Sequence, residues 1–359
     1  MNLIISAGGT GGHIYPGIGV AEAALETGFA RRVLFIGARR GLEGTLVPAA
    51  GFELRTLPVD RVRGMKLTAR LSGIAGLGLS IPRARKLIKE FAADAVVGLG
   101  GYASAPSLIA GSMSGVPTAL CEQNTIPGTT NRFLARFART ICVSFAMSSG
   151  YLPSQKVVVT GNPTRRNIAE ARKVRSERVA DGTFTIVVLG GSQGALFLNQ
   201  TIARSLATFA QGQPSITIIH QTGKGRLDEA RGAYAALGTR AQVVEYVDDM
   251  AGLLTRTDLV VGRAGATTVA ELTAVGVPAL MIQFPHATDN HQYWNAMVMV
   301  RAQAALMHEQ HSFNEADFTA DLAGLFSDAE RLSRMTLNSR QLGRVDAAAN
   351  VLEQLGRIS

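Results

Sequence analysis

The chain has 359 residues, of which 47% are hydrophobic and 18% are charged. This length and composition are typical of a globular protein with two domains, and they exclude a disordered chain. Two cysteines are too few for a disulfide framework, which is consistent with a reducing cytoplasm. The formal net charge is +9, and the whole excess lies in residues 1–160.

The first expected element is a strand at residues 3–7, an apolar run that is too short for a signal peptide. It leads into Gly8-Gly9-Thr10-Gly11-Gly12-His13, which is neither a P-loop nor a complete GxGxxG motif. Each glycine costs entropy on folding, so this concentration of glycines needs a reason. We interpret it as room for a ligand that approaches the backbone closely. His13 would then stand at the start of the next helix; the alternative is a capping histidine without chemistry.

Eight basic residues and no acidic residue lie between residues 61 and 89, on both sides of the uncharged apolar run 71–81. This pattern is typical of a segment that meets an anionic membrane surface, where each Lys or Arg contributes about 1 kcal/mol. A solvated basic helix face beside an ordinary buried helix is the alternative. Nucleic acid is not an expected partner, because the segment has no aromatic residue to stack on bases.

The longest uncharged run, residues 95–121, could span a bilayer by length alone, but glycines, prolines and serines interrupt it. Its pattern predicts a strand, a glycine turn, a helix and a second strand. The turn matches GxGxxA at residues 98–103, a weak signal because no acidic residue follows at the distance expected for a ribose. Residues 258–278 repeat the same order of elements, which predicts two similar parallel-sheet halves.

These patterns predict an α/β protein with two domains, residues 1–161 and 162–340, followed by a C-terminal helix at residues 341–359. The sequence leaves open which domain that helix packs on. Glycine turns at the carboxyl ends of the strands would line a cleft between the domains, where open α/β sheets bind ligands.

Three motifs of the second half carry further hypotheses. Residues 190–195 repeat the glycine loop and predict a diphosphate site made by backbone N–H groups and the Ser192 hydroxyl, or else a tight structural turn. Residues 263–271 place Glu271 one turn into a helix, where it would hold ribose hydroxyls or simply suit the helix dipole. Residues 284–295 are rich in hydrogen-bonding groups, but His286 and His291 do not have the spacing of a zinc pair.

The chain has no Asp-x-Asp motif, and we therefore expect no metal or other cofactor. Helix dipoles, glycine N–H groups and an arginine such as Arg165 would have to hold a diphosphate instead.

Taken together, these motifs resemble the MurG family, bacterial UDP-N-acetylglucosamine transferases that act on an undecaprenyl-diphosphate-linked N-acetylmuramoyl-pentapeptide. The likeness extends from residue 1 to about residue 350 and rests on residues 8–13 with Pro16, 122–124, 161–163 with Arg165, 190–194, 265–271 and 292–296. It implies a GT-B fold, in which two Rossmann-like domains face a cleft. It also implies transfer of N-acetylglucosamine with inversion, the last lipid-linked step of peptidoglycan synthesis, by a peripheral protein on the cytoplasmic face of the inner membrane.

The resemblance implies a role for individual residues as well. Residues 1–161 would face the acceptor and the membrane, and residues 162–340 would bind UDP-N-acetylglucosamine. The expected contacts with substrate are made by Thr10, Gly11, Gly12, Asn124 and Arg165 near the donor, by Ser192 at the diphosphate, by the Val247 backbone at the uracil, by Ala266, Thr267 and Glu271 at the diphosphate and ribose, and by Gln292 at the sugar hydroxyls. His291 stands where some members of the family carry glutamine.

The expected reaction is attack of the acceptor C4 hydroxyl on the anomeric carbon while UDP leaves. His13 has the ordinary pKa range of a general base near neutral pH, although it could instead orient a phosphate. Two rival functions remain open at this point. One is another enzyme of the same fold, such as a hexose transferase or a UDP-N-acetylglucosamine 2-epimerase; an epimerase needs neither lipid nor a basic apolar segment. The other is a nucleotide-sugar-binding or membrane scaffold protein without turnover.

Overall fold

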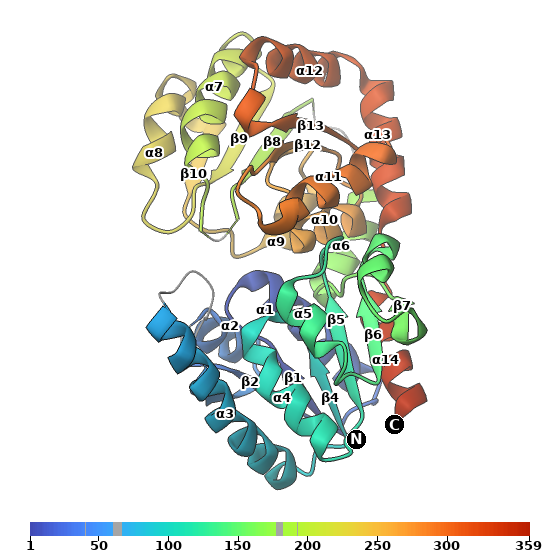
Figure 1. Cartoon of the computed structure of the whole chain (residues 1–359). Coiled ribbons are helices and arrows are strands. Elements are labelled where there is room, and N and C mark those ends of the chain that lie inside the picture. Colours follow the sequence, from blue (N-terminus) through green and yellow to red (C-terminus); the bar gives the residue numbers. More distant parts are fainter. Residues whose placement is uncertain (40, 60–66, 177–181, 192) are drawn as a thin grey trace. The chain divides into compact units, whose positions relative to one another are not determined.

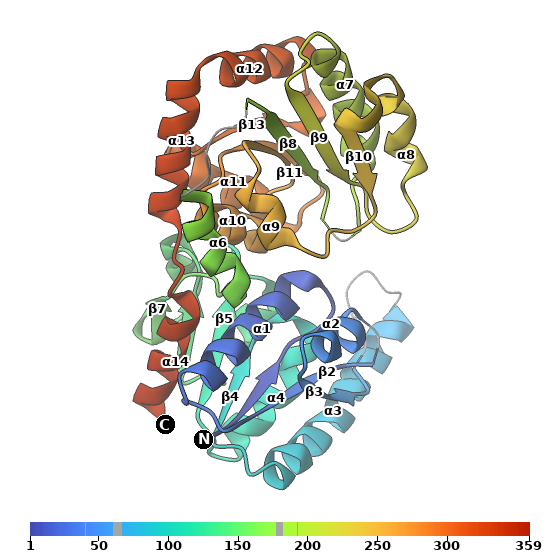
Figure 2. The same ribbon diagram turned by 180° about the vertical axis from the view of Figure 1, so that it is seen from behind.

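The computed structural model describes the chain except residues 40, 60–66, 177–181 and 192, and for residues 67–77 it describes the backbone alone. The chain divides into two compact units (Figures 1 and 2). Unit 1 comprises Met1–Arg166 and Arg344–Ser359, and unit 2 comprises Asn167–Gly343. Because the chain passes from unit 1 to unit 2 and back, its last helix belongs to the same unit as its first strand.

The described residues of unit 1 form a seven-stranded parallel sheet in the order β3-β2-β1-β4-β5-β6-β7. Its strands are β1 (Asn2–Ser6), β2 (Arg32–Ala38), β3 (Glu53–Leu57), β4 (Ala95–Gly98), β5 (Thr118–Glu122), β6 (Thr140–Val143) and β7 (Val157–Val159). The central strands are buried on both faces and are accordingly almost continuously apolar, as parallel strands under helices require.

Helices cover both faces of this sheet. They are α1 (Gly11–Glu26), α2 (Glu43–Ala49), α3 (Leu67–Glu90), α4 (Gly101–Met113), α5 (Thr129–Leu134) and α14 (Ala347–Ile358). Alternate residues of β1 face opposite sides: Leu3 and Ile5 pack in the cluster of α1 and α14, whereas Ile4 packs in the cluster of α3 and α4. Figure 1 shows the α3 and α4 side and Figure 2 the α1 and α14 side.

Unit 2 repeats this architecture in its described residues with a six-stranded parallel sheet in the order β10-β9-β8-β11-β12-β13. Its strands are β8 (Phe184–Leu189), β9 (Ile216–Gln221), β10 (Ala241–Val244), β11 (Leu259–Gly262), β12 (Ala279–Gln283) and β13 (Ala305–Glu309). Its helices are α6 (Arg166–Ser176), α7 (Ala203–Gln211), α8 (Asp228–Arg231), α9 (Met250–Thr255), α10 (Ala266–Val275), α11 (His291–Arg301), α12 (Glu315–Ser327) and α13 (Ala329–Leu342). One apolar core joins four of the strands to α7 and α12.

The structure confirms the predicted α/β class with two parallel-sheet units. Residues 95–121 form β4, the glycine turn, α4 and the beginning of β5, as the pattern predicted. Over the described residues, no helix is long and apolar enough to cross a bilayer.

The helical tail, whose packing the sequence left open, is two helices that separate near Gly343. α13 packs in unit 2, whereas α14 packs against α1 in unit 1. Val351, Leu352 and Leu355 are buried there in the same cluster as Ile14 and Ile18. Asn350 Nδ2 also donates to the Thr160 carbonyl at 3.3 Å. The end of the chain therefore completes the core under β1.

This packing predicts a stability effect confined to unit 1. Leu355→Ala removes a side chain with no exposed surface and should cost about 2–5 kcal/mol. Amide hydrogen exchange should show faster opening of β1 and β4, with β8 and β11 unchanged. Leu337→Ala is the control, because Leu337 is 57% exposed on α13 and should change exchange in neither unit. If the β1 amides of the Leu355→Ala variant exchange as slowly as those of the wild-type protein, the packing of α14 in the unit 1 core is contradicted.

Candidate functional site

In unit 1, the chain reverses its direction of winding between β1 and β4. The connection after β1 leads to β2 on one side, and the connection after β4 leads to β5 on the other. α1 and α4, which carry these connections, lie on opposite faces of the sheet. In open α/β sheets this arrangement leaves a crevice between the two strand ends. Ligands of open α/β sheets bind at such a switch point. Both loops at this point are glycine-rich, at residues 8–12 and 98–101.

Two glycines are required for the close approach of these loops. Gly9 and Gly101 have φ angles of +91° and +72°, a region that other residues rarely adopt. A Cβ atom on Gly101 would lie 3.3 Å from Cδ2 and Nε2 of His13. Glycine at position 101 therefore lets the two loops approach without a side chain against the Nε2 edge of the histidine ring.

His13 is the third residue of α1 and is half-buried. Its Nδ1 lies 3.1 Å from Oε1 of Gln123, which follows β5 directly. The Gln123 amide is itself oriented, because its Nε2 donates to the carbonyls of Leu99 at 3.0 Å and Cys121 at 3.4 Å. Gln123 Oε1 must then accept, so His13 Nδ1 carries the proton and Nε2 keeps its lone pair.

Burial lowers the pKa of His13 below its ordinary value of about 6.5, and the hydrogen bonds to Gln123 and Leu99 oppose this shift without cancelling it. The ring is therefore neutral at pH 7. A neutral imidazole with Nε2 unprotonated is the form that accepts a proton.

Asn124 is placed by a buried carboxylate. Oε1 of Glu122 accepts from the backbone N–H of Asn124 at 2.8 Å and from its Nδ2 at 3.2 Å. Oε2 accepts from Gly128 N at 3.2 Å and Asn131 Nδ2 at 2.8 Å. Burial raises the pKa of Glu122 although these hydrogen bonds favour the charged form. Four donors on one side chain fix the loop that carries Gln123 and Asn124.

Arg165 reaches the first glycine loop through Tyr15. Its guanidinium lies over the Tyr15 ring, 4.2 Å from the centroid. A Cβ atom on Gly11 would in turn lie 3.0 Å from that ring. Thr10, Gly11 and Gly12 begin α1 on the same side, so unit 1 brings its predicted site residues together around the start of one helix.

Unit 2 has its own switch point, between β8 and β11. Residues 190–194 follow β8, and residues 263–265 follow β11 and end at the start of α10. Gly194 has a φ angle of +70°, and a Cβ atom there would collide with the Thr222 carbonyl. Ser192, the predicted diphosphate ligand, lies outside the described residues.

The first two turns of α10 carry three predicted site residues. Ala266 and Thr267 begin the helix, and Glu271 is buried in its second turn. The loop before it is held by Asn295, whose Nδ2 donates to the Ala264 carbonyl at 3.1 Å. The amino end of α10 therefore points its dipole at the strand ends.

Arg263 is a largely buried cation at the same edge. Its Nη1 donates to the carbonyls of Ile282 and Gln283, both at 3.0 Å, and its guanidinium lies 5.2 Å from the centre of the Phe284 ring. Burial lowers the pKa of Arg263 to about 10, which leaves it charged at pH 7. It adds positive charge beside the α10 terminus.

Gln292 lies in the first turn of α11, after a loop in which Asp289 and Asn290 have φ angles of +50° and +53°. Such left-handed residues cost free energy and are held here by the bond from Gln283 Nε2 to Asn290 Oδ1 at 2.8 Å. Gln292 Oε1 is buried, and no described group hydrogen-bonds to it. A ligand hydroxyl would satisfy this acceptor. Val247, the residue predicted to pair with the uracil, lies on neither α10 nor α11. It is half-buried in the loop between β10 and α9.

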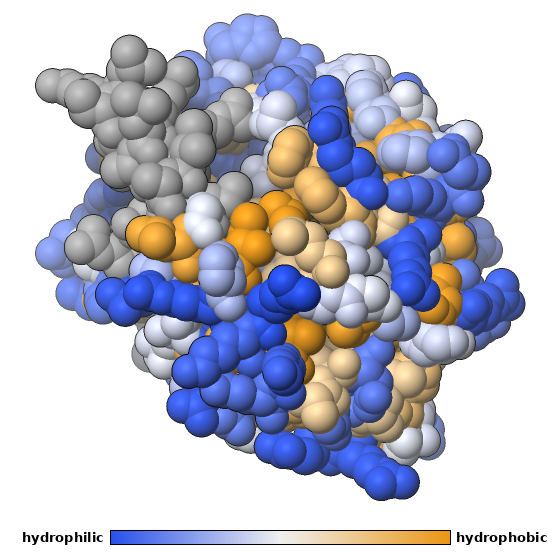
Figure 3. All heavy atoms as spheres, turned by 60° about the horizontal axis from the view of Figure 1, so that its bottom comes forward, coloured by the Kyte–Doolittle hydropathy of each residue, from blue (hydrophilic) through white to orange (hydrophobic). Residues whose placement is uncertain are grey.

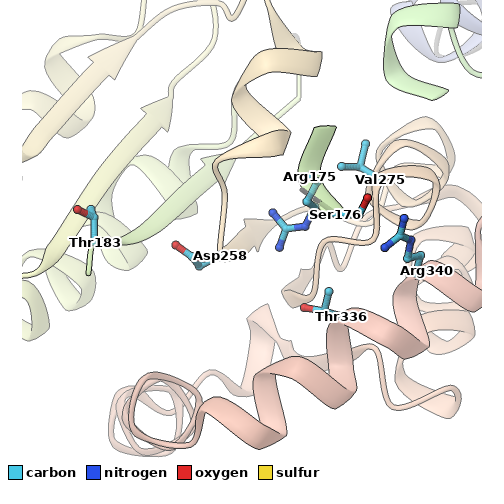
Figure 4. Close-up of a pocket in the computed structure, with 7 residues that line it drawn as sticks. All are labelled: Arg175, Ser176, Thr183, Asp258, Val275, Thr336 and Arg340. Atoms are coloured by element: carbon cyan, nitrogen blue, oxygen red, sulfur yellow. The ribbon is translucent and has the colours of Figure 1, made fainter. Parts of the chain in front are cut away.

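A pocket of about 250 Å³ elsewhere in unit 2 is a separate feature (Figure 4). Thr183 and Asp258 precede β8 and β11, so the pocket lies at the amino ends of the strands, opposite the glycine loops. Arg175 Nη1 donates to the Leu254 carbonyl at 3.1 Å, near the end of α9, and Arg340 Nη2 to the Arg172 carbonyl at 3.3 Å, near the end of α6. These arginines satisfy helix ends, and the pocket is not part of the predicted donor site.

Within the described ranges, no three His, Cys, Asp or Glu side chains lie close enough together to hold a metal ion. Arg263 and the amino end of α10 supply positive charge at this edge of unit 2.

Comparison with known proteins assigns both units to one family. Residues 3–143 match the glycosyltransferase family 28 N-terminal domain, and residues 185–351 match the family 28 C-terminal domain. A UDP-N-acetylglucosamine–N-acetylmuramyl-(pentapeptide) pyrophosphoryl-undecaprenol N-acetylglucosamine transferase of Myxococcus xanthus is 39% identical over 98% of this chain and 92% of its own. The protein of the same description from Geobacter sulfurreducens is 38% identical over 99% and 98%.

The chain belongs to the MurG family of glycosyltransferase family 28.

Solved structures agree with this assignment. The chain is similar to the crystal structure of Acinetobacter baumannii MurG, with a TM-score of 0.76, 27% identity and 99% of each chain covered. It also shares its fold with a UDP-N-acetylglucosamine 2-epimerase of Neisseria meningitidis, with a TM-score of 0.70 at 14% identity. The second likeness concerns the fold alone. The GT-B fold and the glycosyltransferase class expected from the sequence are thereby confirmed.

Several residues that shape the candidate site cannot be recognised from the sequence patterns. Gln123 was noted as part of a motif but not as the partner of His13, and Tyr15, Asn131 and Arg263 were not given roles. A polar residue directly after a buried strand, as at Gln123, is the signal that could have found the first of them. Tyr15 and Arg263 depend on contacts between segments that are distant in sequence, and Asn131 depends on a turn of the chain that brings it back to Glu122.

The His13–Gln123 bond predicts opposite effects of two substitutions on the pKa of His13. Gln123→Ala removes a hydrogen bond that raises this pKa, so the pKa should fall further. Gln123→Glu places a carboxylate beside Nδ1 and should raise the pKa by one unit or more. NMR titration of the His13 ring carbons measures both. Shifts in the same direction for the two variants would contradict the contact.

Proposed function

We propose that this chain transfers N-acetylglucosamine from UDP-N-acetylglucosamine to the C4 hydroxyl of an undecaprenyl-diphosphate-linked N-acetylmuramoyl-pentapeptide. The observation that carries the proposal is the near-complete coverage of relatives described by this activity, at 36–39% identity. The epimerase alternative rests on 14% identity, which reaches no further than the fold. A binding protein without turnover would have no use for the neutral, oriented imidazole of His13.

The reaction needs a base on the acceptor side and positive charge on the donor side. The acceptor O4–H gives its proton to Nε2 of His13 as the O4–C1 bond forms on one face of the donor sugar. The bond from C1 to the β-phosphate oxygen breaks on the opposite face, and its electron pair leaves with UDP. This displacement inverts the anomeric centre and gives a β-1,4 bond.

The donor half of the reaction is assigned to unit 2. The α10 amino terminus at Ala266 and Thr267 would stabilise the charge that grows on the diphosphate. Glu271 would accept from the ribose hydroxyls, and Gln292 Oε1 would accept from a sugar hydroxyl, which satisfies its buried lone pair. The Val247 backbone would pair with the uracil, and Ser192 would reach a diphosphate oxygen.

From unit 1, Thr10, Gly11 and Gly12 would contribute the amino end of α1. Arg165, held over Tyr15, would add a fixed positive charge near it, and Asn124 would face the donor sugar. No metal is required in this scheme, because the leaving group is stabilised by helix dipoles and arginine.

The lipid acceptor requires contact with a membrane, and α3 is the proposed contact. In the described part of this helix, Arg83, Arg85, Lys86 and Lys89 are exposed, and Leu79 is 64% exposed. Figure 3 shows apolar surface next to hydrophilic residues on the face that it views. Basic and apolar side chains together suit the cytoplasmic surface of an anionic membrane, to which the protein would bind peripherally.

The base assignment predicts a loss of turnover in His13→Gln. With UDP-N-acetylglucosamine and a short-chain lipid acceptor, UDP release should fall about 10²-fold to 10⁴-fold, whereas donor binding measured by calorimetry should persist. His311→Gln is the matched control, because His311 lies on the surface of unit 2 and is 61% exposed. Unchanged turnover in His13→Gln would rule out the base role, and no UDP release by the wild-type protein would rule out the transferase.

A further inference from the structure

Glu43, the first residue of α2, is a fully buried acid that no part of the proposed reaction uses. Its Oε2 accepts from the backbone N–H of Gly9 at 2.9 Å. Its Oε1 accepts from the backbone N–H of Ala38, the last residue of β2, at 2.8 Å. One carboxylate therefore joins the glycine loop after β1 to the end of the neighbouring strand.

Three glycines make the space for this carboxylate. A Cβ atom on Gly8 would lie 2.6 Å from Glu43 Oε1, and one on Gly37 would lie 2.8 Å from its Cγ. A Cβ atom on Gly41 would collide with Oε2. Any side chain at these positions would displace Glu43. Glycine at position 8 is thus required by the buried carboxylate and by Ala103, whose Cβ atom would lie 2.8 Å away, and not only by room for a ligand.

The hydrogen bond to Glu43 also fixes where α1 begins. Gly9 adopts the left-handed φ of +91°, and its N–H is already bound. One residue later Thr10 is extended as the N-cap, and its carbonyl accepts the first bond of α1 from His13 N at 3.1 Å. The orientation of the Gly9 peptide plane therefore sets the direction from which His13 enters the crevice.

We propose that Glu43 is a positioning residue for glycosyl transfer. It holds the first glycine loop in the arrangement that places His13 Nε2 against Gly101. The same arrangement fixes the backbone of residues 10–12 at the amino end of α1. Glu43 touches no substrate and acts through the Gly9 amide. The inference rests on the proposed role of His13 as the base, and it extends that role by naming what holds the base in place.

Glu43→Gln tests the proposal with almost no change in volume. The amide NH₂ replaces one acceptor oxygen and meets a backbone N–H, so one of the two hydrogen bonds is lost. A catalytic group displaced by about 1 Å can lose about 100-fold in rate. We expect kcat to fall about 10-fold to 100-fold, with the dissociation constant of UDP-N-acetylglucosamine changed less than about threefold, because unit 2 is proposed to supply most donor contacts.

Two controls separate positioning from folding. Glu53→Gln makes the same chemical change at an exposed residue of β3 and should keep wild-type kcat. Leu355→Ala weakens the unit 1 core that includes α1 but leaves both Glu43 hydrogen bonds in place, so it measures how much general destabilisation lowers kcat per folded molecule. If Glu43→Gln lowers kcat no more than Leu355→Ala does, the positioning role is wrong.

An NMR readout distinguishes the failure of this inference from the failure of the proposed function. The Gly9 amide proton should move upfield in Glu43→Gln whether or not the protein transfers sugar, because its bond to a charged carboxylate is either lost or replaced by a weaker bond to a neutral amide oxygen. An unmoved Gly9 resonance overturns the positioning role. If the wild-type protein transfers no sugar but the Gly9 resonance moves in Glu43→Gln, the proposed function is wrong and the Glu43–Gly9 contact is confirmed.

Discussion

Each unit of this chain places the carboxyl ends of two central parallel strands side by side and sends the two chains away to opposite faces of the sheet. At that point a crevice opens because no crossover helix covers it. In unit 1 the crevice lies between β1 and β4, and in unit 2 between β8 and β11. The chemistry proposed here depends on what each crevice holds: a neutral imidazole in the first, a helix terminus with an arginine beside it in the second.

Buried carboxylates have a structural role in the first crevice. Glu43 binds the Gly9 amide, and Glu122 binds the amides of Asn124 and Gly128. Each acid thus satisfies backbone N–H groups in an irregular loop, where sheet or helix partners are lacking. Strong acceptors of this kind hold a loop in one conformation. His13 lies between the loops so fixed, and its partner Gln123 belongs to the one that Glu122 holds.

Much of the fold could be predicted from the sequence, because parallel strands buried on both faces appear as continuous apolar runs. The runs at residues 3–7, 95–98 and 258–262 led to β1, β4 and β11, and the repeated order of elements led to two α/β units. The packing of α14 could not be predicted, because an amphipathic helix fits either unit and only three-dimensional contact with α1 decides between them.

The candidate site was predictable where residues follow a strand directly and not where they depend on contact across the sheet. The glycine loop and His13 stand next to an obvious strand, and family resemblance supplied roles for Asn124, Arg165 and Glu271. Those roles remain predictions. Glu43 has no signal of this kind, because it follows no strand directly and its only distinctive sequence neighbours are Gly41 and Gly44. Its meaning depends on Gly8 and Gly9, more than thirty residues earlier, which sequence spacing alone does not reveal.

The central claim is that unit 1 presents a neutral imidazole whose Nε2 is free to accept a proton. The most direct test is the ¹⁵N NMR spectrum of histidine-labelled protein at pH 7, in which the two ring nitrogens of His13 are assigned through their couplings to the ring protons. We expect the Nδ1-protonated tautomer, with Nε2 at the shift of an unprotonated nitrogen. A ring protonated at Nε2, or at both nitrogens, would contradict the account.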